Sequence, residues 1–71
     1  MTETKLAYMA NQIATFFASR PPDRAAAGVA GHINQFWDPR MRRQLLEMLE
    51  RDPSGLHEAV IAAGPSIRRP A

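Results

Sequence analysis

Five of the six prolines divide this 71-residue chain into four stretches, each about as long as one short helix. They stand in Arg20-Pro21-Pro22, Asp38-Pro39, Asp52-Pro53 and Gly64-Pro65. Proline lacks the backbone N–H that a helix interior needs and disfavours helical geometry in the residue before it. Every helix in this chain must therefore be short, and any core must be built where several helices meet.

Four helices are expected between these breaks, and no strand-like alternation is present, so the predicted fold class is all-α. The first helix covers residues 4–18, with an apolar stripe at helical spacing formed by Leu6, Met9, Ala10, Ile13, Phe16 and Phe17. The second covers residues 23–36 or 23–37. It contains Gly28 and Gly31, which cost about 1 kcal/mol each relative to alanine and are most easily explained by a closely approaching backbone.

The two Asp-Pro pairs predict the starts of the last two helices. An aspartate N-cap accepts a hydrogen bond from a free amide of the first turn, and a proline at the first helical position has no amide to leave unpaired. The third helix follows Asp38, and a shorter fourth helix, capped by Asp52 or Ser54, ends at Gly64-Pro65 and carries Leu56, Val60 and Ala63. Residues 1–64 are expected to form one domain of four short helices. Residues 65–71 should be a flexible tail, disordered unless a partner binds it.

The core of such a small domain is marginal, because a chain of this size buries only about 60 % of its unfolded surface. Twelve of the hydrophobic residues are alanines, which bury little area. The absence of cysteine excludes disulfides, thiolate zinc sites and iron–sulfur ligation. Either the helices pack very economically or a partner completes the fold.

No residues form the pattern of a catalytic, cofactor-binding or metal site. Catalysis needs a nucleophile or an acid–base pair supported by its neighbours. His32 and His57 fall on different predicted helices and outside any metal-binding motif, and there is no glycine-rich phosphate loop. Capping explains Asp38 and Asp52. We therefore expect a non-catalytic chain.

The net charge is only +2, and the pI of 9.9 reflects the fact that eight of the nine basic residues are arginine. A small nucleic-acid-binding module is a possible alternative, with phosphate contacts from Arg40, Arg42, Arg43, Arg68 and Arg69. The low net charge and the glutamates among the arginines of the third helix argue against it. Residues 6–18 resemble a signal-peptide core, but they are interrupted by polar residues and too short to span a bilayer. We expect no membrane segment and a cytoplasmic location.

The back of the first helix is the first feature that favours protein binding. This side carries no charge, although solvent-facing helix sides usually carry lysine and glutamate. A neutral polar face with a tyrosine is typical of a protein–protein contact. The alternative is a surface that lacks charge by chance. The residues are Tyr8, Asn11, Gln12, Thr15 and Ser19.

The second feature is the Phe36-Trp37 pair with the arginines that follow it. Adjacent residues on a helix point about 100° apart, so one ring can enter the core while the other lies at its edge or outside. Tryptophan and arginine are over-represented among residues that dominate binding energy. Arg42 lies beside the apolar stripe of the third helix, unlike Arg40. In the alternative, Trp37 fills the corner between two helices and Arg42 pairs with Asp38.

Two motifs carry a resemblance to a known family. They are KLAYMANQIATFFAS (Lys5–Ser19) and HINQFWDPRMRRQLL (His32–Leu46). Together with their spacing, they resemble the delta subunit of the cytoplasmic, NAD-dependent, molybdenum-containing formate dehydrogenases. The resemblance covers about the first fifty residues, and the chain after Arg51 carries little family signal.

The resemblance implies a small subunit without a redox centre, associated with assembly or stability of its complex. Formate would be oxidised to carbon dioxide on the large alpha subunit at bis-molybdopterin guanine dinucleotide. Electrons would pass through iron–sulfur clusters to FMN and NAD on the beta and gamma subunits. A permanent subunit and a transient maturation factor for cofactor insertion both remain possible. Contacts with the large subunit are expected at Tyr8, Asn11, Gln12, Thr15, Phe36, Trp37, Arg40 and Arg42.

Overall fold

The first three helices begin and end close to the positions that the prolines predict. The computed structural model describes residues 2–70, in which these helices are α1 (Glu3–Phe17), α2 (Pro22–Phe36) and α3 (Pro39–Arg51). The hydroxyl of Thr2 caps α1 by accepting a hydrogen bond from the Lys5 amide at 3.2 Å. The carboxylate of Asp38 caps α3 by accepting one from the Met41 amide at 2.8 Å, as predicted. No strand occurs between residues 2 and 70, which confirms the all-α fold.

The start of the fourth helix differs from the prediction. Asp52 caps only a single 3-10 turn, η1 (Pro53–Gly55), and its carboxylate accepts a hydrogen bond from the Ser54 amide at 3.2 Å. Leu56 follows in an extended conformation with its side chain buried. α4 (Glu58–Ala63) begins only after His57, whose Nδ1 accepts a hydrogen bond from the Ala59 amide at 3.0 Å. The predicted helix from Asp52 or Ser54 through Leu56 is wrong because the chain leaves the helical path to turn Leu56 into the core.

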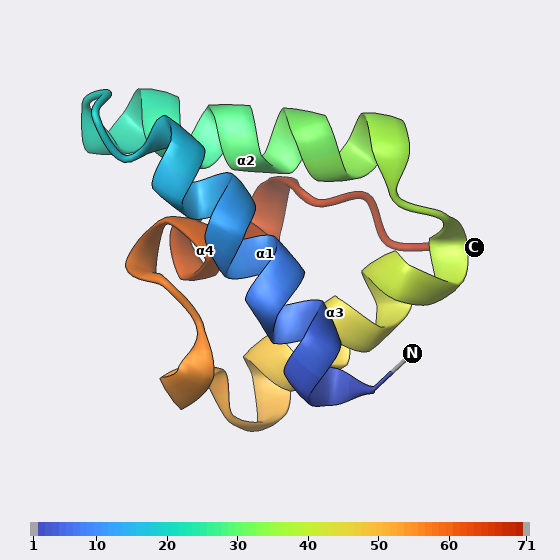
Figure 1. The fold of residues 1–71 in the computed structure, drawn as a ribbon. Coiled ribbons are helices and arrows are strands. Elements are labelled where there is room, and N and C mark those ends of the chain that lie inside the picture. The colour runs from blue at the N-terminus through green and yellow to red at the C-terminus, as the bar shows by residue number, and fades with distance from the viewer. Residues whose placement is uncertain (1, 71) are drawn as a thin grey trace.

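The four α-helices meet around one core. α2 packs against both α4 and α1, and α3 contacts α1 (Figure 1). Five larger side chains are fully buried: Leu6, Val29, Ile33, Leu45 and Val60. Six alanines are also buried: Ala10, Ala14, Ala25, Ala30, Ala59 and Ala63. Because the distance between packed helices depends on the side chains at their contact, these alanines allow close approach. Close packing of the helices at alanine residues therefore helps this chain to form its core.

The segment after α4 is more ordered than the predicted tail. It forms a second 3-10 turn, η2 (Gly64–Ser66), and then runs back along α2 (Figure 1). The side chain of Ile67 is buried in the core. The Asn34 amide holds the backbone on either side of Ile67, because it donates to the Ser66 carbonyl at 3.0 Å and accepts from the Arg68 amide at 2.8 Å. The prediction missed these contacts because one apolar residue in a polar segment gives little periodic signal. Ala71 lies outside the described residues.

A candidate partner-binding groove

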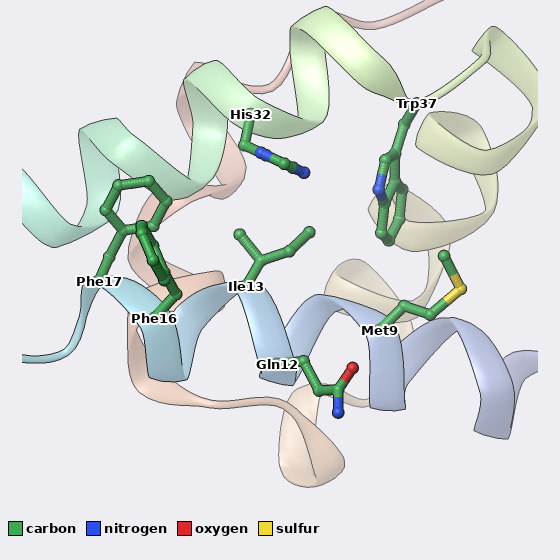
Figure 2. Close-up of a pocket in the computed structure, with 7 residues that line it drawn as sticks. All are labelled: Met9, Gln12, Ile13, Phe16, Phe17, His32 and Trp37. Atoms are coloured by element: carbon green, nitrogen blue, oxygen red, sulfur yellow. The ribbon is translucent and has the colours of Figure 1, made fainter.

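A groove of about 510 Å³ lies between α1 and α2 (Figure 2). Met9 and Trp37 lie at one end of it, and Phe16 and Phe17 lie at the other (Figure 2). None of the side chains that line it is an aspartate, glutamate, lysine or arginine. The lining residues are Met9, Gln12, Ile13, Phe16, Phe17, His32 and Trp37. The groove therefore offers a mainly apolar, aromatic surface to solvent.

Phe16 and Phe17 form one end of the groove but are placed very differently. Phe17 is half-buried and packs against α2, whereas Phe16 is 71 % exposed. The two rings meet edge to face, with centroids 5.0 Å apart. The sequence-based stripe placed both on the buried side, which is wrong for Phe16. Side chains of adjacent helical residues point about 100° apart. The same reasoning that was used for Phe36 and Trp37 therefore predicts that only one of the two rings is buried.

Trp37 is the inner member of the second aromatic pair. Its side chain is only 6 % exposed and belongs to the core at the corner between α2 and α3. Phe36 is 66 % exposed and extends the groove at its rim, since its ring centroid lies 4.8 Å from that of His32. The structure thus selects between the two arrangements that the sequence left open: Trp37 fills the corner, and Phe36 faces out.

The predicted neutral face of α1 is only partly open to solvent. Tyr8 is 62 % exposed, and Gln12 Nε2 donates a hydrogen bond to its hydroxyl at 2.9 Å. Thr15 is exposed, and its hydroxyl donates to the carbonyl of Asn11 at 2.9 Å. Gln12 also lines the groove, so the polar face and the apolar groove are adjacent on α1.

Asn11 differs from its neighbours on this face because its side chain is used within the chain. Its Nδ2 donates to the carbonyl of Gly55 at 3.0 Å, and its Oδ1 accepts from the amide of His57 at 2.8 Å. Both bonds reach the connection between η1 and α4, more than forty residues away in the sequence. Asn11 therefore fixes the connection that leads into α4.

The two arginines singled out in the sequence are also placed differently. Arg42 is half-buried, and its Nη1 donates to the carbonyl of Trp37 at 3.3 Å. The alternative pairing with Asp38 is not among the ion pairs of residues 2–70, and the Asp38 carboxylate caps α3 instead. Arg40 is exposed and lines a shallow hollow at the start of α3, with Asp38 and Arg43. Arg42 therefore braces the backbone at Trp37, and neither Arg42 nor Arg40 is among the residues that line the groove.

Residues 2–70 contain no cluster of histidine, aspartate and glutamate side chains that could hold a metal ion. His57 serves as the N-cap of α4, and His32 lies against Phe36 at the rim of the groove. No helix in the described part of the chain is long and apolar enough to cross a membrane. The mainly apolar lining of the groove suits contact with an apolar surface.

The family model described as NADH-dependant formate dehydrogenase delta subunit FdsD matches residues 5–63. The chain belongs to this delta-subunit family. The match runs from the first turns of α1 to the last residue of α4, and so includes both walls of the groove. It also extends beyond the first fifty residues, to which the sequence motifs alone confined the resemblance. A comparison with curated proteins gave no significant match.

Proposed function

We propose that this delta subunit is a non-catalytic component that binds the large, molybdenum-containing alpha subunit of an NAD-dependent formate dehydrogenase in the cytoplasm. In this role it supports assembly or stability of a complex that also contains beta and gamma subunits. The observation that carries the proposal is the uncharged groove with Phe16 and Phe36 exposed at its rim. Contiguous exposed apolar surface on a small domain is typical of a protein-binding site.

The eight residues expected to contact the partner divide into a contact group and a supporting group. Tyr8, Gln12 and Phe36 are exposed beside or in the groove and would touch the large subunit directly. Asn11 and Trp37 would act from within, because they hold the elements that carry the contact surface. Arg42 would contribute its guanidinium beside one end of the groove. The exposed residues Thr15 and Arg40 would lie at the margin of the contact.

The cofactors of the complex belong to the other subunits in this proposal. Iron–sulfur clusters need cysteine thiolates, and bis-molybdopterin guanine dinucleotide, FMN and NAD all carry phosphate groups that need cationic side chains or free backbone amides. The chain has no cysteine, and its groove is open and mainly apolar. These residues do not fit any of these groups, so formate oxidation and NAD reduction would take place outside this chain.

Co-purification with the dehydrogenase complex tests the proposal. The full chain, tagged and expressed with the other subunits, should elute with the alpha subunit in fixed stoichiometry. Phe16→Ser combined with Phe36→Ser should lose this association and keep its helical circular dichroism spectrum, because both rings are exposed. Ile61→Ser is the matched control, because Ile61 is an exposed apolar residue on α4, outside the groove.

The outcomes separate the function from its location on the surface. Absence of the parent chain from the complex would contradict the proposed function. A double variant that stays bound as tightly as the parent would contradict the assignment of the groove alone. Association restricted to an alpha subunit without its molybdenum cofactor would identify a transient maturation factor instead of a permanent subunit.

A further inference from the structure

Between its two ends, the groove offers a partner side chains and no free backbone groups. Its walls are α1 and α2, whose backbone amides and carbonyls are bonded within their own helices except in the terminal turns. An extended segment would bury its backbone groups there without partners, at roughly 1–3 kcal/mol for each unsatisfied group. A helix satisfies its own backbone hydrogen bonds. The chemistry of the groove therefore favours a helical occupant.

The α1 wall also has the shape that a helix requires. Met9, Gln12, Ile13 and Phe16 line it at helical spacing and form two adjacent i, i+4 rows. Rows of this kind pack into the grooves between side-chain rows of a neighbouring helix. No permanent charge interrupts these rows, so the facing side of the occupant should be apolar.

A guanidinium group contacts one lining residue near each end of the groove, although neither arginine lines the groove itself. At one end, the Arg20 guanidinium carbon lies 5.1 Å from the ring centroid of Phe17. At the other end, Arg42 Nη1 donates to the carbonyl of Trp37. Phe17 and Trp37 both line the groove, so each cation lies beside one of its ends. Arg20 also lines a second hollow, which it shares with Glu58.

Among residues 2–70, neither arginine forms an ion pair with a carboxylate. The ion pairs among residues 2–70 are Arg51 with Glu3 and Arg69 with Glu50. The Nε of Arg42 is shielded from solvent and has no hydrogen-bond partner within these residues. A carboxylate is the strongest acceptor that a partner can supply to the accessible nitrogens of an unpaired guanidinium. The charge at both ends of the groove thus calls for acidic groups on the occupant.

We infer that the groove holds one helix of the large subunit, with an apolar face between two carboxylates, one for Arg20 and one for Arg42. This inference rests on the proposed function, since it specifies what the alpha subunit would place on the delta subunit. On α2, nine residues separate Gly28, which lies under Phe17, from Trp37, or about 14 Å at 1.5 Å per residue. The two carboxylates should therefore lie at opposite ends of an apolar helix face of about this length.

Site-directed photocross-linking tests the identity of the occupant. The chain has no cysteine, so Phe16→Cys gives one attachment point for a benzophenone label at the groove, and Ile61→Cys gives a control on α4. In the assembled complex, the label at Phe16→Cys should attach to one alpha-subunit helix whose apolar face is bounded by acidic residues. Attachment to a second copy of this chain, or to a segment without such acidic residues, would overturn the inference. The control should not label the same peptide.

Charge substitutions test the two ends of the groove. Arg20→Glu and Arg42→Gln should each weaken binding of the full chain to the complex prepared without it by about tenfold, mainly through lost charge pairing. Glutamine at 42 keeps an amide near the Trp37 carbonyl. Arg68→Glu is the control, because it makes the same change in charge as Arg20→Glu at an exposed residue outside the groove, and it should change affinity by less than about twofold.

The results distinguish failure of this inference from failure of the proposed function. If the parent chain binds and both Arg20→Glu and Arg42→Gln bind equally well, the acid-flanked helix is wrong and the subunit role stands. If the parent chain does not bind the complex, the proposed function fails and the inference fails with it.

Discussion

The ring of Phe17 lies against the backbone of α2 at Gly28. A Cβ atom at residue 28 would meet Cδ1 of this ring at 2.5 Å, closer than side chains approach each other in proteins. Gly31 is different, because a Cβ there would have no atom within 4 Å. The prediction of a closely approaching backbone is therefore wrong at both glycines, because a side-chain ring makes the close approach at Gly28 and nothing makes one at Gly31. Nothing in the structure explains Gly31.

Alanine at these two positions should change stability in opposite directions. Gly31→Ala should raise the free energy of unfolding by about 1 kcal/mol, through helix propensity alone. Gly28→Ala gains the same propensity but overpacks the contact with Phe17, so it should lower the free energy of unfolding by about 1 kcal/mol. For a domain of this size, each change should move Tm by about 4–8 °C in a thermal melt.

A double-mutant cycle identifies the ring as the cause. In a Phe17→Ala background, Gly28→Ala should become stabilising by about 1 kcal/mol, because the clash is gone. If Gly28→Ala is equally destabilising with and without the ring, the close approach of Phe17 is not what requires glycine there.

The two adjacent aromatic residues at the end of α2 should contribute very differently to stability. Trp37→Ala removes a buried ring and should lower the free energy of unfolding by about 3–5 kcal/mol, enough to unfold much of so small a domain. Phe36→Ala should change it by less than about 0.5 kcal/mol, because the ring is exposed. Urea titrations followed by circular dichroism measure both. Equal losses of stability would contradict the assignment of Phe36 to the surface.

Asn11 should contribute stability although it lies on the polar side of α1. Asn11→Ala removes both hydrogen bonds to the connection before α4, and at about 1 kcal/mol for each bond it should lower the free energy of unfolding by about 2 kcal/mol. Thr15→Ala is the control, because the Thr15 hydroxyl bonds only the backbone of its own helix. If both variants melt at the same temperature, the long-range contacts of Asn11 do not stabilise the fold.

The helices of this chain could be predicted from local chemistry, whereas the partner of each side chain could not. The prolines and the Asp38 cap act within a few residues of themselves, so they fix where α1, α2 and α3 begin and end. Asn11 looked like a surface residue because nothing near it in the sequence indicates that Gly55 and His57 lie beside it. Likewise, periodicity gives the apolar side of α1 to within about one residue on the helical wheel. Phe16 and Phe17 differ by one residue, so periodicity could not tell which of them is exposed. For this reason the groove could not be predicted from the sequence.

Asp52 should make the stability of the domain depend on pH in the acidic range. Hydrogen bonds from the Ser54 hydroxyl and backbone amide hold the pKa of the Asp52 carboxyl below its ordinary value. A group whose pKa is lower in the folded state stabilises that state when it is ionised. Its contribution is therefore fully present above the unfolded pKa of about 3.9 and is lost as the pH falls through the folded value.

Two variants isolate this contribution. Asp52→Asn cannot ionise, so its stability deficit relative to the parent should be largest near pH 7 and should shrink as the pH falls below about 4. Ser54→Ala removes the hydroxyl but keeps the backbone amide, so its deficit should shrink in the same pH range and be smaller at pH 7. The measurement is the free energy of unfolding in urea at several pH values for the three chains. A deficit of Asp52→Asn that is the same at pH 3 and pH 7 would mean that the cap at η1 depends on shape and not on charge.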